Sequence, residues 1–155
     1  MKNHTKTAED TSAREIAVSR LFAAPRELVY RMWTEPEHIV HWWGPTGFTD
    51  TIKIMDVRPG GRWSHVMHGP DGVDYQNESV YVEVTPPERL VFDHVLAPNF
   101  RMTVTFEDQG GQSLVRVQLL FPDAALRDLV VKQYGALEGA KQNLAKLETY
   151  LAAQR

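Results

Sequence analysis

The stretch YQNESVYVEVTPPERLVFDHV (75–95) places two runs of strand-forming residues on either side of Pro86-Pro87. Valine, tyrosine and phenylalanine are enriched in β-strands, whereas a Pro-Pro pair marks a turn. The link between the runs is too short for the crossover helix that parallel neighbours need. The two strands are therefore predicted to pair antiparallel.

The same pattern continues in both directions from this hairpin. Turn residues separate six stretches of β-branched, aromatic and aliphatic residues. We expect strands over residues 48–57, 61–68, 73–84, 89–96, 100–107 and 113–121. A further strand precedes them, because apolar and polar residues alternate from Arg14 to Phe22. No helix is predicted between any two of the six, so they should form an antiparallel meander.

Two short helices are expected between the first strand and the meander. Pro25 suits the first turn of a helix, and apolar residues at three- and four-residue spacing continue to Trp33. Thr34 is expected to cap a second helix, with Pro36 near its first turn. That helix should end at Gly44-Pro45, after Trp42 and Trp43.

The C-terminal region predicts one continuous helix from Asp123 to Ala153, because it lacks proline and carries an apolar stripe. An antiparallel sheet has an apolar face to cover, and this is the longest predicted helix. The predicted fold class is α+β, a seven-stranded antiparallel sheet around a long C-terminal helix. Residues 13–155 should form the domain and residues 1–12 a flexible tail. The stripe consists of Leu126, Val130, Leu137, Leu144, Leu147 and Leu151.

The composition narrows the class of protein. Apolar residues make up 43% of the 155 residues and the formal net charge is −3, which predicts a globular domain with no nucleic-acid partner. Cysteine is absent from the sequence, which excludes disulfides and thiolate sites. No apolar run has the length of a signal peptide or a membrane span, so we expect a cytoplasmic protein without membrane insertion.

Most of the chain from Arg20 to Leu151 resembles one known family. The segments that carry the resemblance are RLFAAPRELVYRMWTEPEHIVHWWGPTGF (20–48), MDVRPGGRW (55–63), PDGVDY (70–75), EVTPPERLVF (83–92), VTFEDQGG (104–111) and EGAKQNLAKLETYL (138–151). They are similar to proteins related to the activator of the ninety-kilodalton heat-shock chaperone's ATPase, a family of the START-like (SRPBCC) superfamily. The resemblance implies a helix-grip fold of the birch-pollen-allergen type, with a cavity between sheet and helix.

One position departs from a pattern found in part of that family. Some members resemble one another in a Gly-Trp pair where this chain has Gly139-Ala140. Alanine is far smaller than tryptophan, so we expect free space beside the middle of the helix.

Strand alternation suggests which side chains would line such a cavity, since alternate residues share one face. For Trp43, packing against the end of the sheet is an alternative to ligand contact. In the strand at 73–84 the sequence leaves open whether Asn77 and Tyr81 or the intervening valines face inward. The expected ligand-binding residues are Trp43, Trp63, His65, Phe92, His94, Met102, Tyr134 and Leu137.

Catalytic and metal sites have weaker support. The sequence contains no G-x-S-x-G elbow, P-loop, dinucleotide fingerprint or H-E-x-x-H. His38 and His41 are close enough to share a metal ion with Glu35 or Glu37, but spacing fixes no third ligand. We predict no catalytic residue, metal or cofactor. Arg127, Lys132, Glu138, Lys141, Lys146 and Glu148 are expected on the solvated face of the last helix.

These observations predict a binding protein for an apolar or aromatic small molecule. The alternative is a stress-related interaction module that acts on a heat-shock chaperone through its surface. The superfamily resemblance also permits an enzyme that uses the same cavity. Ligand identity and oligomeric state are not fixed by the sequence.

Overall fold

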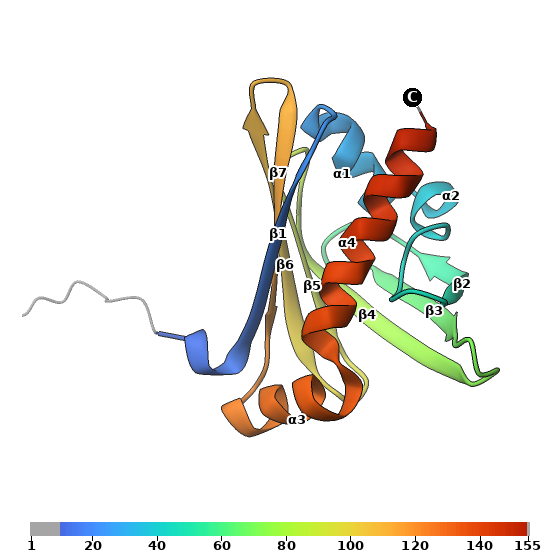
Figure 1. Ribbon diagram of the computed structural model, residues 1–155, viewed down its shortest axis with the longest axis vertical. Coiled ribbons are helices and arrows are strands. Elements are labelled where there is room, and N and C mark those ends of the chain that lie inside the picture. The colour runs from blue at the N-terminus through green and yellow to red at the C-terminus, as the bar shows by residue number, and fades with distance from the viewer. Residues whose placement is uncertain (1–9, 155) are drawn as a thin grey trace, which may run out of the picture.

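Seven antiparallel strands form one sheet in the computed structural model, which describes residues 10–154 (Figure 1). The strands lie in the order β1-β7-β6-β5-β4-β3-β2. The six later strands thus form the predicted meander, and β1 adds to β7 with Glu15 opposite Leu120 and Phe22 opposite Ser113. The strands are β1 (Glu15–Phe22), β2 (Thr49–Met55), β3 (Arg62–His68), β4 (Asp74–Thr85), β5 (Arg89–His94), β6 (Phe100–Gln109) and β7 (Gln112–Leu120).

Helices precede and follow the meander, and none lies between its strands. α1 (Arg26–Thr34) covers the region predicted for the first helix, with Pro25 as its N-cap and not in its first turn. Thr34 does not cap the second helix, because it ends α1 and its Oγ1 donates a hydrogen bond to the carbonyl of Tyr30 at 3.0 Å. α2 (Pro36–Ile39) has its proline in the first turn and stops before Trp42, well short of the expected end. A short 3-10 turn, η1 (Ser12–Arg14), precedes β1, and residues 1–9 of the expected tail lie outside the described part.

The prediction of one continuous C-terminal helix is wrong. The chain forms α3 (Ala124–Tyr134) and α4 (Ala136–Ala153), separated by Gly135 in the left-handed conformation with φ +60°. The Gly135 amide donates to the carbonyl of Val130, which ends α3 as a glycine C-cap does. Neither an apolar stripe nor the lack of proline reveals such a cap. The break alters the phase of the stripe, which leaves Leu137 37% exposed while Leu144, Leu147 and Leu151 are buried.

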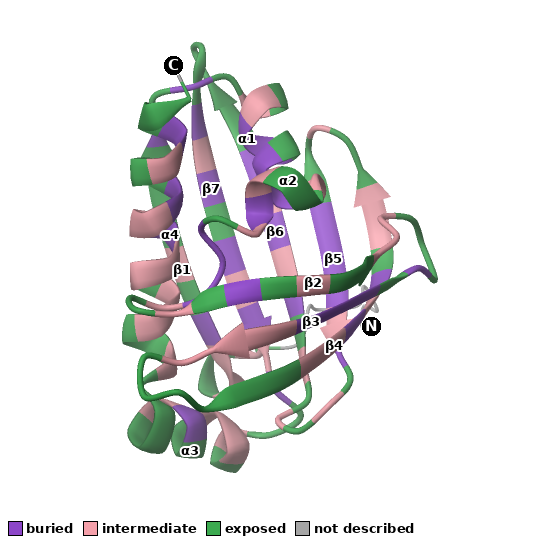
Figure 2. Ribbon diagram, turned by 90° about the vertical axis from the view of Figure 1, so that its right-hand side faces the viewer, coloured by how far each residue is buried: buried purple, intermediate pink, exposed green. Residues whose placement is uncertain are grey.

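The sheet bends into a cup whose concave face is covered by α4. Figure 2 shows β2, β3 and β4 running across the direction of β5, β6 and β7, with buried residues along the latter three. Tyr81 and Ser79 are buried, which settles the open question about β4: the face with Asn77 and Tyr81 points inward. A bulge between Tyr81 and Glu83 then turns Val84 toward the core.

Within residues 10–154, every helix is too short or too polar to cross a lipid bilayer.

Candidate ligand cavity

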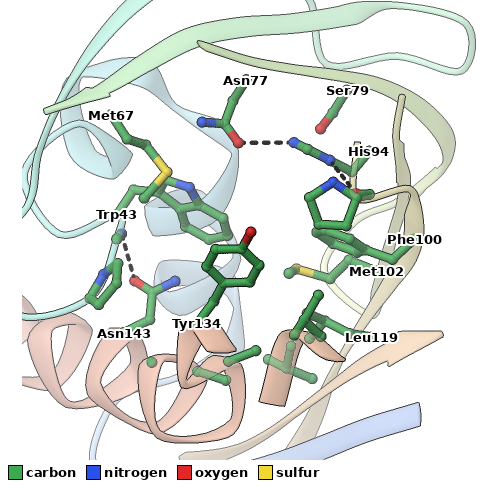
Figure 3. Close-up of a pocket in the computed structure, with 18 of the residues that line it drawn as sticks. Trp43, Met67, Asn77, Ser79, His94, Phe100, Met102, Leu119, Tyr134 and Asn143 are labelled. Carbon is green, nitrogen blue, oxygen red and sulfur yellow. Dashed lines mark hydrogen bonds between the residues drawn. The ribbon is translucent and has the colours of Figure 1, made fainter. Parts of the chain in front are cut away.

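A cavity of about 650 Å³ lies between the concave face of the sheet and the helices α3 and α4 (Figure 3). This volume is within the range of small-molecule sites, roughly 300–1,000 Å³. Strands β3 to β7, both helices and the segment from Trp43 to Pro45 contribute its lining. Among the described residues, no aspartate, glutamate, lysine or arginine side chain takes part in that lining. The cavity is therefore suited to a mainly apolar molecule.

The two adjacent tryptophans after α2 have different roles. Trp42 is fully buried and its Nε1 donates to the carbonyl of Met32 at 3.2 Å, so this ring belongs to the core. Trp43 lines the cavity, with its ring centroid 5.0 Å from that of Trp63 and 5.5 Å from that of Trp33. Edge-to-face packing of this kind fixes each ring in one orientation. Trp33, Trp43 and Trp63 thus form one aromatic part of the lining.

His65 lies on the sheet side of the cavity and is paired with a carboxylate. Its Nδ1 is 2.7 Å from Asp50 Oδ1, and the side chains of both residues are nearly inaccessible to solvent. The imidazole also stacks on the indole of Trp63 at 4.2 Å. A carboxylate oxygen accepts hydrogen bonds, so Asp50 fixes the proton of His65 on Nδ1. Ring packing and the carboxylate together hold the imidazole in place.

His94 is the second histidine of the lining, and both of its ring nitrogens have partners. Nδ1 is 2.9 Å from the carbonyl of Pro98, and Nε2 is 2.9 Å from Oδ1 of Asn77. The ring stacks on Phe100 with a centroid distance of 4.9 Å. Burial lowers the pKa of His94 below its ordinary value of 6.5, because desolvation disfavours the imidazolium.

The polar side chains of the lining form a row across adjacent strands. In the register of the sheet, His65 faces Asn77 and Ser79 faces His94, while Asp50 lies on the neighbouring strand β2. Figure 3 shows Asn77 and His94 joined on the sheet side, with Tyr134 reaching in from the helix side. The cavity thus has a polar row on one wall and apolar surfaces elsewhere.

Seven of the eight residues expected at a ligand site border this cavity. They are Trp43, Trp63, His65, Phe92, His94, Met102 and Tyr134. Tyr134 is 73% exposed and lies at the mouth, at the end of α3. Leu137 is outside the lining, because the break at Gly135 turns it away from the sheet. Ala140 borders the cavity.

Several residues of the site, in the lining or behind it, were not predicted from the sequence. Asp50 supports His65 from β2, but only the register of β2 against β3 brings the two side chains together. Strand alternation did contain a signal for β7 and the residue after it, where Val117, Leu119 and Phe121 all border the cavity. The indole of Trp33 had no such signal, since it reaches the cavity from α1.

Side chains of α4 hold the loop at the mouth of the cavity. Asn143 Oδ1 accepts from the Gly44 amide at 3.1 Å, and Gln142 Oε1 accepts from the Thr46 amide at 3.2 Å. Lys146 Nζ donates to the carbonyls of Pro45 and Phe48 at 3.3 and 3.1 Å. Lys146 is thus half-buried against the loop and not on the solvated face expected for it, and burial lowers its pKa.

The histidines considered for a metal site have other partners. His38 Nδ1 is 2.8 Å from the Tyr150 hydroxyl and its Nε2 is 3.4 Å from a carboxylate oxygen of Glu35. The ring of His41 stacks on Tyr150. Within residues 10–154, no three histidine, aspartate or glutamate side chains are grouped as metal ligands would be.

Comparison with known proteins places this architecture in a family. A family model described as activator of Hsp90 ATPase homolog 1-like protein matches residues 23–152. No curated protein is matched by the chain. Solved structures share the fold: protein NE0264 from Nitrosomonas europaea, at 24% identity, has a TM-score of 0.85 over 92% of this chain and 97% of its own.

Two further structures agree with this result. Protein Ms6760 from Mycobacterium smegmatis, also at 24% identity, has a TM-score of 0.84 over 97% of this chain and 99% of its own. The AHSA1 protein SPO3351 from Silicibacter pomeroyi, at 20% identity, has a TM-score of 0.74 over 91% of this chain and 99% of its own. The likenesses establish the START-like helix-grip fold, and the family model covers most of the sequence. The chain belongs to the family of proteins like the activator of Hsp90 ATPase homolog 1.

Proposed function

We propose that this protein binds one small apolar molecule in the cavity between its sheet and its C-terminal helices. The observation that carries the proposal is the cavity itself, about 650 Å³ of space with a lining of aromatic and aliphatic side chains and few polar groups. Apolar surface that leaves water for such a lining contributes about 25 cal/mol per Å². The proposed contacts are Trp43, Trp63, His65, Phe92, His94, Met102 and Tyr134.

A fluorescent apolar probe tests this function. Titration with the uncharged fluorescent probe N-phenyl-1-naphthylamine should saturate at one site per chain, and a hydrocarbon such as naphthalene should displace it. The affinity for the probe should fall in Trp43→Phe, because that ring borders the cavity, and persist in the matched variant Trp42→Phe, whose ring is in the core. Native mass spectrometry of the purified protein would identify any retained molecule. Failure of every apolar probe to bind the folded protein would refute the proposal.

Family membership favours a second candidate, an interaction with a heat-shock chaperone. Such a protein would act through its surface, so Ala140→Trp, which fills the cavity, should leave its effect on the chaperone's ATPase unchanged. If no apolar probe binds and the ATPase responds to the protein, the second candidate replaces the first. A cytoplasmic location stays a prediction from the sequence.

A further inference from the structure

The polar row on the sheet wall contains hydrogen-bonding atoms that are free to meet a ligand, and Nε2 of His65 is one of them. His65 Nδ1 is engaged by Asp50, but Nε2 has no hydrogen-bond partner among residues 10–154. Nε2 is not one of the fully buried side-chain atoms that lack a partner in that region, which are Trp33 Nε1, Asp50 Oδ2 and Trp63 Nε1, so it keeps some accessible surface although the His65 side chain is only 2% exposed. Because this side chain borders the cavity, the accessible surface left to Nε2 faces the ligand space.

Of the other polar groups of the row, Ser79 Oγ also lacks a hydrogen-bond partner among residues 10–154, whereas His94 and Asn77 are less available. Both ring nitrogens of His94 are within 2.9 Å of a partner, on Asn77 and on Pro98. Asn77 uses its Nδ2 to donate to the carbonyl of Tyr75 at 3.1 Å. A ligand atom would have to break one of these hydrogen bonds to reach His94 or the same atoms of Asn77. His65 Nε2 can accept a new partner without losing an existing one.

The charges around the cavity exclude a strongly ionic ligand group. The described lining contains no lysine or arginine, so an anionic ligand would lack a permanent counterion. The carboxylate of Asp50 already lies 2.7 Å from His65 and would repel a second carboxylate on the other side of the ring. A cationic ligand would meet no carboxylate in the lining itself. An isolated charge buried without a partner is unfavourable by many kcal/mol.

We infer that the ligand is an uncharged apolar molecule with a hydroxyl group, and that His65 Nε2 is its hydrogen-bond partner; this inference rests on the proposed binding function. A hydroxyl donates to Nε2 of a neutral imidazole and accepts from Nε2–H of an imidazolium, so it suits His65 in either state. Asp50 orients the ring so that Nε2 stays directed at the ligand. The ring system of the ligand would occupy the apolar remainder of the cavity.

Three probes of one ring size test the inference: naphthalene, 2-naphthol and 2-naphthoate, titrated at neutral pH by displacement of the fluorescent probe. The wild-type protein should bind 2-naphthol about tenfold more tightly than naphthalene, and 2-naphthoate more weakly than both. In His65→Leu the preference for the naphthol should disappear, while naphthalene still binds.

Two further variants separate this role from a structural one. His65→Leu leaves Asp50 buried without its partner, so Asp50→Leu/His65→Leu removes the whole pair, a replacement that buried ion pairs often tolerate. His68→Leu is the matched control, because His68 lies on β3 like His65 but outside the cavity. Its Nδ1 is likewise 2.7 Å from a carboxylate oxygen, that of Asp74. His68→Leu should keep the tenfold preference and the double variant should lose it.

The possible results are distinct. Equal binding of naphthalene and 2-naphthol by the wild type overturns the inference and leaves the proposed function intact. A preference that survives in the double variant overturns the assignment to His65. Tighter binding of 2-naphthoate overturns the conclusion about charge. If none of the three binds, both the proposed function and the inference fail.

Discussion

The side-chain oxygen of Asn143, on α4, accepts a hydrogen bond from the main-chain amide of Gly44 at 3.1 Å. This contact, drawn as a dashed line in Figure 3, joins the helix to the loop that carries Trp43 and Pro45, two residues that line the cavity. Gly44 has φ +103°, and a Cβ added there would lie 3.0 Å from Met67 Cε and Phe48 Cβ. The loop is therefore held in one place by the helix, by its own glycine and by close packing.

Loss of this hydrogen bond should loosen the mouth of the cavity. We expect Asn143→Ala to lower the free energy of unfolding by about 1 kcal/mol and to speed the release of a bound probe. Stopped-flow dissociation and urea denaturation measure the two effects. Asn143→Asp keeps an acceptor at the same distance and is the control. Equal release rates in wild type and Asn143→Ala would show that the loop does not limit exit.

Filling the space beside Ala140 should compete directly with the ligand. Ala140 borders the cavity, so the indole of Ala140→Trp should occupy ligand space and weaken probe binding at least tenfold, about 1.4 kcal/mol. Stability should be nearly unchanged or higher. If Ala140 were in a close-packed core, the same substitution would lower the free energy of unfolding by about 1–3 kcal/mol through overpacking. A large fall in melting temperature with unaltered probe binding would place the cavity elsewhere.

The break between α3 and α4 should give two glycines opposite responses to alanine. At Gly135 an added Cβ would meet no atom within 4 Å, so Gly135→Ala causes no steric clash with other residues. The remaining effect is the cost of the left-handed backbone conformation, which should lower the free energy of unfolding by about 1 kcal/mol. Gly139 is inside α4, where an added Cβ would lie 3.8 Å from Pro45 in ordinary contact. Gly139→Ala should stabilise by about 0.4–1 kcal/mol. Urea denaturation measures the free energy of unfolding of both variants. If both variants gain stability, or both lose it, the helix break at Gly135 is contradicted.

Acid should destabilise the fold through His94. Burial lowers its pKa in the native state, whereas the unfolded chain keeps the ordinary value of 6.5. The unfolded state then binds more protons than the native state as the pH falls through 6.5. Stability is therefore complete above that pH and is lost as the pH decreases toward the lowered pKa. His94→Gln should flatten this part of the profile of unfolding free energy against pH. Parallel profiles for the two proteins would assign the loss to other groups.

The strands were predictable because they depend on local patterns. Alternation and turn residues located all seven strands, and the short links between them required antiparallel pairing. The inward set of β6, from Phe100 to Phe106, also followed from alternation. Features that depend on a single backbone conformation did not follow: apolar spacing continues through Gly135, although the helix does not.

The cavity was predictable in outline for a related reason. Residues of one strand that share a face, such as Trp63 and His65, follow from the period of two. Contacts between strands can be predicted only when the register of the strands is known, and the register does not follow from the alternation of residues within one strand. Asp50 reaches His65 only because Asp50 is opposite Met67, two residues further along β3. The bulge at Tyr81 likewise changes which residues of β4 face inward.

The pairing of β1 with β7 sets the order in which a nascent chain can complete this protein. Each strand from β3 to β7 pairs with its predecessor and can do so as it leaves the ribosome, whereas β1 is translated first and can pair only after β7 has been made. Non-local pairing of this kind slows folding, because a long loop must close first. The cavity forms later still, because α3 and α4, which complete its lining, are translated after β7. A ligand can therefore stabilise finished chains, while chains still under synthesis have no cavity to offer it.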